Sequence, residues 1–254
     1  MPLKVLHLNI QGAVRFNDVI SYINKHSFDI VQMQEVAGGF FSKSVHHDTF
    51  QAIKEHLGYN GVLAKAFAMK GEPESYDGNA TFYKKTLNVL RSDVLALRPF
   101  EFVEPFTNND LDRIRILPRN ALSLLVEHEG SPLWFVNAHL AWGPNEKDEP
   151  EKLRQAQVFK EYLDLFDHPY VLTGDFNVEK DTQVTKLITG ENINHTILTD
   201  LKNTLSPQLH RAHHLFPPGL AVDFIITTKE VKTRDFSVID DVLSDHLGLK
   251  ITIL

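Results

Sequence analysis

Short apolar runs recur along the chain and predict a fold rich in β-strands. Some runs alternate with polar residues and others are continuous, which is typical of strands buried on one or on both faces. We expect strands at residues 3–9, 30–33, 61–66, 80–83, 87–97, 121–128, 133–140, 170–177, 222–228, 233–239 and 247–253. Apolar residues at helical spacing predict helices at residues 17–24, 48–57 and 152–166.

These strands are too numerous for one parallel sheet of βα units. Residues 121–128 and 133–140 are joined by a short polar turn, which favours antiparallel pairing. We therefore predict an α/β fold in which two packed, largely antiparallel sheets carry helices on their outer sides. No repeat or long linker divides the chain, so residues 1–254 are expected to form one domain with surface loops at 69–77, 99–112 and 143–151.

Composition narrows the classes of function. The net charge of −7 disfavours a protein that coats nucleic acid through broad electrostatic attraction. The absence of cysteine excludes disulfides, thiolate zinc sites and cysteine nucleophiles. The first residues, MPLKVLHLNIQG, lack the pattern of a secretory signal, and no apolar stretch approaches the length of about 18 residues that predicts a membrane span. We expect a soluble, cytoplasmic monomer.

Polar side chains interrupt several of the apolar strands. In VLTGDFN, alternation places Asp175 and Asn177 on one face of the strand. In WFVNAHL, Asn137 and His139 share a face in the same way, and Asn9 ends the first strand. A buried carboxylate or amide is costly unless it is paired, hydrogen-bonded or bound to a metal ion. These positions are therefore candidates for a functional site.

Other polar residues lie at strand ends. Glu35 ends the strand IVQMQE, Asp223 lies near the start of AVDFII, and Asp245 and His246 precede the last strand. Each alone has an ordinary explanation, because a strand-end aspartate often caps a turn and GDFN can be a strand followed by an Asx turn. The same explanation would have to hold at every one of these places. Carboxylates, amides and imidazoles without a candidate nucleophile favour metal-assisted attack of water on a phosphate.

The order of these motifs resembles the endonuclease/exonuclease/phosphatase superfamily of deoxyribonuclease I-like, metal-dependent phosphoesterases. The matching segments are LKVLHLNI, VQMQEV, DGNATFYKK, LPRNALSLL, FVNAHL, VLTGDFN, AVDFIITT and LSDHLGL. They follow the family order between residues 3 and 249, and the ordered set with GDFN is specific although QEV or SDH alone is weak. The resemblance implies a four-layer α/β sandwich with its site at one end of two packed sheets.

The resemblance also implies roles for individual residues. Glu35 and Asn9 would lie at the principal Mg²⁺ or Mn²⁺ ion, with Asp245 as a further ligand or near neighbour. Asp175 and Asn177 would position or deprotonate the attacking water and hold the phosphate. The number of metal ions and the identity of the general base stay open.

The remaining carried-over roles concern the phosphate. His246, oriented by Asp223, would bind a phosphoryl oxygen or act as acid or base, and His139 would stabilise charge on the phosphorane. Contacts to the substrate are expected from Arg119, Asn120 and Asn137.

Departures from the family pattern bear on the substrate. His7 stands where the family often has tryptophan, and VIDDVLSDH lacks the tryptophan-rich signature of abasic endonucleases. A basic substrate loop typical of inositol phosphatases is also missing. LPRNALSLL and AHL are similar to the tyrosyl-DNA phosphodiesterase and small bacterial phosphodiesterase branches, although Val178, Glu179 and Lys180 follow GDFN where the former branch is commonly rich in arginine.

Hydrolysis of a phosphoester by metal-activated water is therefore the expected function. The expected substrates are nucleic-acid or nucleotide phosphodiesters; the alternative is a lipid or small-molecule phosphoester, as in sphingomyelinases. A non-catalytic binding module is disfavoured because Glu35, Asp175 and His246 are present. Other conceivable features are a zinc site at residues 46–47 or 213–214 and base or lipid contacts by Tyr76 or Trp142. Adjacent residues on an extended chain point to opposite faces, so the histidine pairs are poorly placed for zinc, and ordinary anchoring of loops is favoured for the two aromatic residues.

Overall fold

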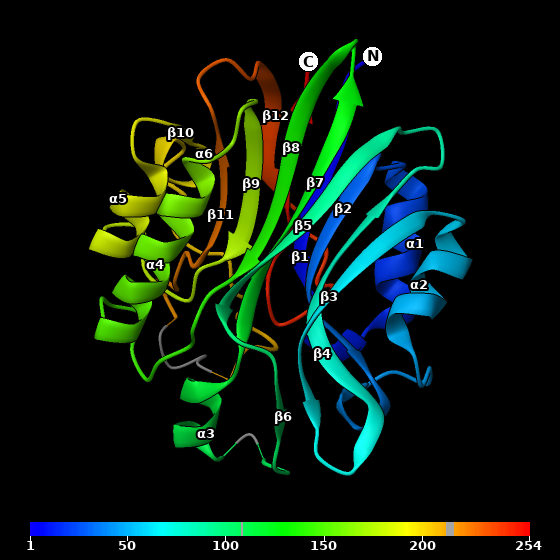
Figure 1. Cartoon of the computed structure of the whole chain (residues 1–254), viewed down its shortest axis with the longest axis vertical. Coiled ribbons are helices and arrows are strands. Elements are labelled where there is room, and N and C mark those ends of the chain that lie inside the picture. Colours follow the sequence, from blue (N-terminus) through cyan, green and yellow to red (C-terminus); the bar gives the residue numbers. More distant parts are fainter. Residues whose placement is uncertain (108, 212–215) are drawn as a thin grey trace.

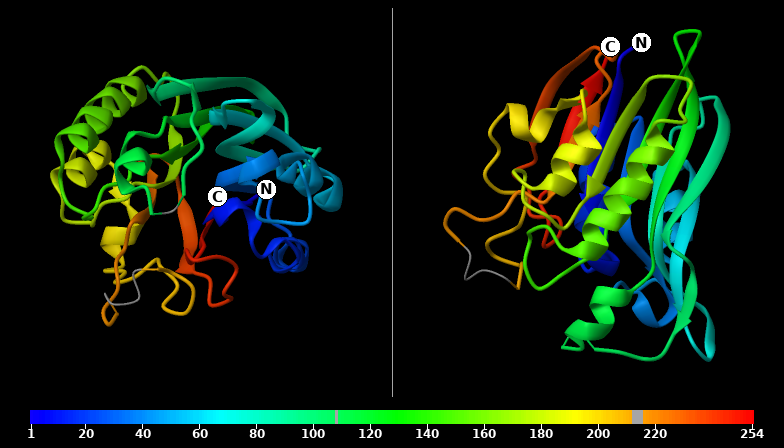
Figure 2. Two further views of the ribbon diagram at one scale, coloured as in Figure 1. Left: turned by 90° about the horizontal axis from the view of Figure 1, so that it is seen from below. Right: turned by 60° about the vertical axis from the view of Figure 1, so that its left-hand side comes forward.

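The computed structural model describes residues 1–107, 109–211 and 216–254 and contains two β-sheets packed face to face, with helices outside (Figure 1). Seen from one end, helices flank the sheets on opposite sides (Figure 2). The predicted α/β sandwich of two largely antiparallel, mixed sheets is therefore confirmed. No helix within the described ranges is long and apolar enough to cross a membrane.

The two sheets differ in size. The larger has the order β12 (Thr233–Val238), β13 (Leu249–Ile253), β1 (Leu3–Asn9), β2 (Ile30–Gly38), β4 (Glu72–Tyr83), β3 (Asn60–Met69) and β6 (Glu101–Val103). The smaller has the order β10 (Ile193–Asn194), β11 (Asp223–Thr227), β9 (Tyr170–Asp175), β8 (Ser131–His139), β7 (Arg119–His128) and β5 (Val89–Arg98). Pairs β1–β2, β3–β6 and β8–β9 are parallel.

Helices cover the outer face of each sheet. The larger sheet carries α1 (Phe16–His26) and α2 (Thr49–Leu57), and the smaller carries α4 (Pro150–Leu163) and α5 (Gln183–Thr189). Shorter elements are α3 (Leu111–Ile116), α6 (His195–Leu198) and the 3₁₀ turns η1 (Gln11–Ala13) and η2 (Gly39–Phe41). The limits of α2 follow from its sequence, because Asp48 accepts a hydrogen bond from Gln51 N and Gly58 takes the left-handed conformation that ends the helix.

The face between the sheets changes character along the strands. In β1, Leu6 packs on the helix side, whereas Leu3 and Val5 belong to the core between the sheets. By alternation, His7 and Asn9 continue this inner face towards the end of the strand. The same change from apolar to polar occurs along β8 and β9. The inner space is thus apolar near the chain termini and polar at the opposite end, where these strands end.

Residues 69–77, which we predicted as a loop, form a β-hairpin. β3 turns at residues 70–71 and returns as β4, so that Phe67 pairs with Asp77. The polar, proline-containing sequence resembles a loop, but pairing with β3 outweighs this local preference. A Cβ on Gly78 would lie 2.2 Å from the carbonyl oxygen of Ala64, so the close approach of the two strands requires glycine.

Other differences involve short elements and strand ends. The predicted loop at 99–112 contains β6 and the start of α3, and β10, α5 and α6 were also not predicted. Elements of two to seven residues are too short to show a clear period. The strand predicted at 30–33 extends to Gly38, and the strand predicted at 170–177 ends at Asp175.

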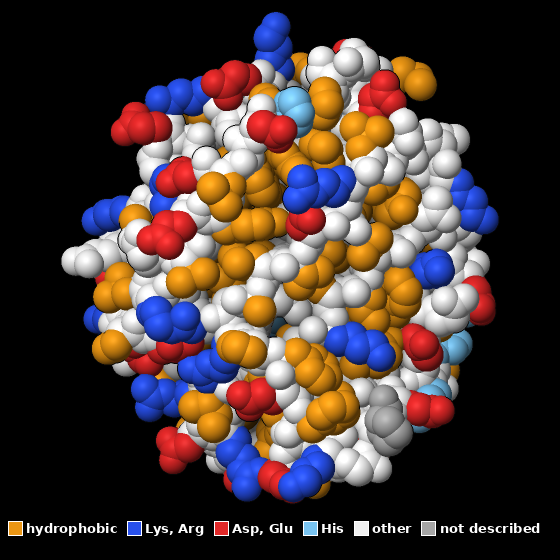
Figure 3. All heavy atoms as spheres, viewed as in Figure 1, with side chains coloured by type: hydrophobic (Ala, Val, Ile, Leu, Met, Phe, Trp, Pro, Cys, Tyr) orange, Lys and Arg blue, Asp and Glu red, His pale blue; other side chains and the backbone are white. Residues whose placement is uncertain are grey.

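One face of the molecule has mixed charge (Figure 3). On the face in Figure 3, Lys and Arg side chains are interspersed with Asp and Glu, and apolar side chains lie between them. This face offers no broad basic track of the kind that binds long nucleic acids by electrostatics alone.

Candidate active site

Adjacent strands of the smaller sheet bring three predicted site residues together. Asp175, at the end of β9, pairs with His139 of β8 on one side and with Asp223 of β11 on the other. All three side chains are buried. A Cβ on Gly174 would lie 2.7 Å from the carbonyl oxygen of Ala138, so glycine in the GDFN motif allows this close strand packing.

Glu35 lies in a β-bulge within β2 and not at a strand end as predicted. Val31 and Met33 pack on the helix side of the sheet, and strict alternation would send Glu35 to the same side. The pairing with β4 instead shifts between Met33 and Val36, and Glu35 has a φ of 53°. Its carboxylate therefore faces the cavity at the end of the sheets. The left-handed conformation costs about 1–2 kcal/mol, which points to a functional reason for this orientation.

Two amide side chains orient the carboxylates of the cavity. Asn9 Nδ2 donates to Glu35 Oε1 and to Asp175 Oδ2, each at 3.1 Å. Gln11 Nε2 donates to Asp245 Oδ2 at 2.6 Å. Asn9, which we predicted as a metal ligand, is buried and is not among the residues that line the cavity; its amide nitrogen contacts two carboxylates instead. Gln11, two residues further along the chain, has no sequence signal of this role.

Asp223 is held between two buried histidines. His246 Nδ1 donates to Asp223 Oδ2 at 2.9 Å, and His7 Nε2 donates to Asp223 Oδ1 at the same distance. Gln34 Nε2 lies 3.3 Å from His7 Nδ1 and fixes the ring from its other side. His246 Nε2 is left to face Asp175 Oδ2 at 3.7 Å. In the sequence, His7 was notable only as a departure from the family pattern. The structure shows why a polar side chain is buried there: it forms a hydrogen bond with Asp223.

The two site histidines favour opposite protonation states. Burial lowers the pKa of His246, but the carboxylates of Asp223 and Asp175 outweigh it and raise the pKa well above its usual value. Burial and the positive charge of Arg119 lower the pKa of His139 well below its usual value, although Asp175 Oδ2 lies 3.6 Å away. These shifts favour the charged form of His246 and the neutral form of His139. Such a separation is typical of paired groups with different chemical tasks.

Without a bound cation, ionisation of the carboxyl groups in the cavity is unfavourable. Burial and the nearby charge of Glu35 raise the pKa of Asp77 to about 8. Burial also raises the pKa of Asp175 to about 6 and, together with Glu35, raises the pKa of Asp245. At Asp77, the positive charge of Arg119 opposes part of this rise in pKa. A bound divalent cation would stabilise the ionised carboxylates further.

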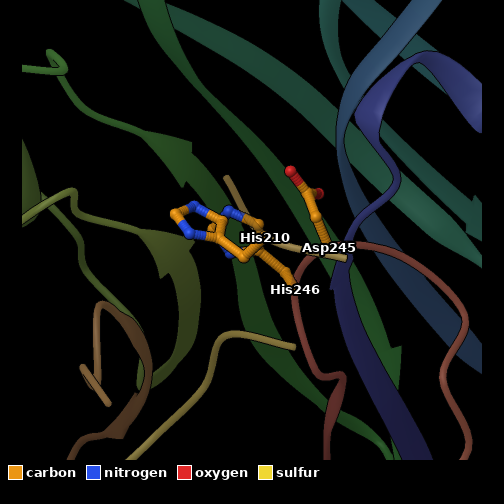
Figure 4. A group of neighbouring side chains, drawn as sticks. All are labelled: His210, Asp245 and His246. Atoms are coloured by element: carbon orange, nitrogen blue, oxygen red, sulfur yellow. The ribbon is translucent and has the colours of Figure 1, made fainter. Parts of the chain in front are cut away.

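Two groups of described residues have the proximity needed to hold a metal ion. They are His210, Asp245 and His246, shown in Figure 4, and Asp175, Asp223 and His246. Both groups require His246 as a ligand, yet its Nδ1 donates to Asp223 and its charged form has no free lone pair. Oxygen ligands from the carboxylates alone are chemically better suited to Mg²⁺. His210 also belongs to the cavity, and burial together with the charge of His246 lowers its pKa to about 4.

The cavity itself has a volume of about 210 Å³. Most predicted site residues line it, namely Glu35, Arg119, His139, Asp175, Asn177, Asp245 and His246. Asn177 lies beyond the end of β9 and has a φ of 54°; its backbone N donates to Asp175 Oδ1 at 3.0 Å. This Asx turn, and not strand alternation, brings Asn177 to the cavity.

Two of the predicted substrate contacts lie elsewhere. Asn137 is buried between the sheets, where its Nδ2 donates to the carbonyl oxygens of Met33 (3.0 Å) and Ala80 (2.9 Å). Asn120 Nδ2 donates to the carbonyl oxygen of Ala64 at 3.0 Å. Neither residue lines the cavity. Both side chains form hydrogen bonds from the smaller sheet to the larger one. Strand alternation predicted correctly that they face inward, but it does not show what lies opposite them.

An Asn137→Ala variant should therefore lose stability and keep its affinity for substrate. Removing the amide leaves buried polar groups of both sheets with fewer partners, which costs about 1–3 kcal/mol in the free energy of unfolding. Urea denaturation would measure this loss, with exposed Asn24→Ala as a control expected within about 0.5 kcal/mol of the parent. An increased KM with unchanged stability would instead indicate a substrate contact.

The remaining sequence features have ordinary surroundings. The ring of His46 packs on Phe16, with centroids 4.3 Å apart, and His47 Nε2 lies 3.1 Å from Glu74. Neither histidine belongs to a candidate metal group among the described residues. Residues 213–214 lie outside the described ranges. Tyr76 is buried and its hydroxyl donates to Asp48, so it is an anchor, whereas Trp142 lines the cavity.

Comparisons with known proteins identify the family and the fold. The Endonuclease/Exonuclease/phosphatase family matches residues 6–246, and no curated protein matches the sequence. An endonuclease/exonuclease/phosphatase from Bacteroides vulgatus is 21% identical with a TM-score of 0.72, covering 100% of this chain and 99% of that one. The human Nocturnin catalytic domain with bound sulfate is 19% identical with a TM-score of 0.70, covering 100% and 94%. A mannosyl-6-phosphatase from Bacteroides thetaiotaomicron is 17% identical with a TM-score of 0.68, covering 99% of each chain.

Proposed function

Because this chain belongs to the endonuclease/exonuclease/phosphatase family, we propose that it hydrolyses phosphodiesters with the help of Mg²⁺ or Mn²⁺. One observation carries the proposal. Glu35, Asp175 and Asp245 line a single cavity beside Arg119 and the charged imidazole of His246. Carboxylates that suit a hard cation thus lie next to cationic groups that suit a phosphate.

Glu35 and Asp245 are the proposed holders of the cation. Each accepts a hydrogen bond from an amide, Asn9 or Gln11, that fixes its orientation. Oxygen donors suit Mg²⁺ and Mn²⁺ better than softer ions. Burial raises the pKa of Asp245, and a bound cation would favour its ionised form. When bound, the ion would act as a Lewis acid on the phosphate and lower the pKa of water.

Asp175 is the proposed base. Its pKa, raised by burial to about 6, lies close enough to neutrality for it to accept a proton from an attacking water and release it again. Asn9 and the backbone N of Asn177 donate to its two oxygens and fix its orientation.

The phosphate would be bound by cationic and neutral donors. The charged His246 presents Nε2 towards the cavity and can donate its proton to a phosphoryl or leaving oxygen. Neutral His139 can donate a hydrogen bond without adding charge. Arg119, which also lines the cavity, would neutralise part of the phosphate charge.

The cavity contains charged side chains of both signs. Its acidic residues are Glu35, Asp77, Glu146, Asp175 and Asp245, and its Lys and Arg residues are Lys43, Arg119 and Arg211. The proposed diester follows from the motifs LPRNALSLL and AHL, which are similar to those of phosphodiesterase branches of the family. A nucleotide phosphodiester or a phosphodiester at a nucleic-acid end is the proposed natural substrate, since Trp142 at the cavity can stack on a base.

We expect hydrolysis of bis-p-nitrophenyl phosphate in Mg²⁺ or Mn²⁺, with a higher kcat/KM than for p-nitrophenyl phosphate. A chelator should abolish the activity, and Zn²⁺ should restore it poorly because the donors are mostly oxygen. Nucleotide diesters and 5′-linked DNA ends should be cleaved, and abasic duplex should be a poor substrate. Full activity in a metal-free preparation would contradict the metal-dependent mechanism, and a preference for the monoester would contradict the choice of diester.

A further inference from the structure

One side of the cavity is apolar. This apolar wall consists of Phe41, Phe67, Phe106, Ile114 and Leu117. The ring centroid of Phe41 lies 5.2 Å from that of Phe67 and 5.8 Å from that of Phe106, so the three rings form one continuous surface.

The wall is assembled from segments distant in sequence. Phe41 ends η2, Phe67 belongs to β3, Phe106 follows β6, and α3 contributes Ile114. Parallel pairing of β6 with the edge of β3 brings this part of the chain to the cavity. Both α3 and β6 lie at the end of the molecule opposite the termini (Figure 1).

The wall is not part of the main core. Its residues form a small cluster apart from the three large clusters that hold the sheets and helices together. Phe41, Phe106 and Ile114 are only partly buried and face the open space of the cavity. Apolar surface left in contact with water is unfavourable, and a ligand that covers it gains free energy.

The wall adjoins the polar centre of the cavity directly. Phe67 is the strand partner of Asp77, and Leu117 precedes Arg119 by two residues. Asp77 and Arg119 line the same cavity as the proposed catalytic groups. An apolar group on the wall is therefore close enough to be covalently attached to a phosphate at the centre.

We infer that the apolar wall is a substrate subsite for an apolar group esterified to the scissile phosphate. This inference rests on the proposed phosphodiesterase function and adds the chemical class of one ester substituent. The face of a nucleobase and an alkyl chain both present apolar surface that could cover the wall. Each methylene that enters the subsite multiplies kcat/KM by about four, until the wall is covered.

Glycerophosphate diesters test the inference, with methyl, butyl, octyl or 5′-thymidyl as the second ester group. The glycerol side stays polar and the phosphate keeps one negative charge throughout the series. Phosphorus NMR measures hydrolysis below the micellar concentration of the octyl ester. We expect kcat/KM to rise at least about tenfold from the methyl ester to the octyl or the thymidyl ester.

Variants of the wall provide the structural control. Phe106→Ala and, separately, Ile114→Ala should lower the ratio of kcat/KM for the larger ester to that for the methyl ester, by about tenfold for Phe106→Ala. The melting temperature of each variant verifies that it folds. Phe100→Ala removes an exposed ring that does not line the cavity, and its ratio should equal that of the parent.

The outcomes separate the inference from the proposed function. A gain restricted to the thymidyl ester, or to the alkyl esters, supports the subsite when Phe106→Ala reduces it, and it then identifies the natural group. A gain that the wall variants leave unchanged belongs to another part of the cavity, such as Trp142, and overturns the subsite. Equal kcat/KM for all four esters overturns the subsite while the phosphodiesterase function stands. If no ester is hydrolysed, the proposed function fails, and calorimetry with stable octyl and methyl methylphosphonates decides the subsite: tighter octyl binding supports it, and equal binding overturns it.

Discussion

Replacing His246 by alanine should lower kcat for phosphodiester hydrolysis by about 10³-fold, within the range that one positioned acid–base group contributes. The variant loses the charged Nε2 that lies 3.7 Å from Asp175 in the cavity. Asp223→Ala should also lower kcat strongly, because the imidazole then loses both its orientation and the charge that keeps it protonated. Initial rates in Mg²⁺ measure both losses, with His168→Ala, outside the cavity, as a control of unchanged kcat.

The double variant distinguishes a dyad from two independent residues. If Asp223 acts through His246, the double variant should be little worse than His246→Ala, because residues that act as a unit are non-additive. Multiplication of the two losses would assign Asp223 to the structure alone. This result would fit its second contact, at 2.9 Å, with His7.

The pH profile gives a second readout of the same pair. Asp223 contributes to the raised pKa of His246, so Asp223→Asn should lower that pKa. Activity that requires charged His246 should then be lost at a lower pH than in the parent. An alkaline limb in the same position in both proteins would show that Asp223 does not set the charge of His246.

Replacing Glu35 by alanine should weaken the apparent affinity for Mg²⁺ by at least about 100-fold and reduce kcat sharply. Even residues that only orient a metal ligand change affinity by about 10–100-fold, so a direct carboxylate ligand should contribute no less. The fold should be retained, because Glu35 is only partly buried and makes its contact with Asn9 at the cavity.

Titration calorimetry with Mg²⁺ measures the affinity, and the melting temperature verifies the fold. Glu191→Gln is a suitable control, since it removes only an exposed ion pair with Lys229. Equal Mg²⁺ affinity in Glu35→Ala and the parent would overturn the assignment of Glu35 as a metal ligand.

Local sequence patterns determined the strands and much of the polar face. Alternation along β1 and β8 predicts that Asn9 and His139 lie on inner faces, and register then brings His139 beside Asp175. The ordered motifs also identified the family. Strand alternation and motifs depend only on residues that are close together in the sequence, so they can be identified from the sequence alone.

Only the tertiary structure decided which polar groups face the cavity. Alternation would turn Glu35 towards the helices, and a bulge in β2 turns it the other way. Asn137 faces inward as predicted, but its amide binds the backbone of the opposite sheet and not a substrate in the cavity. His7 forms a hydrogen bond with Asp223, which is 216 residues away in the sequence. The apolar wall likewise forms only when β6 pairs with β3. A β-bulge and a contact between two sheets both depend on packing between distant parts of the chain. The hydrophobic pattern of a short stretch of sequence does not reveal such packing.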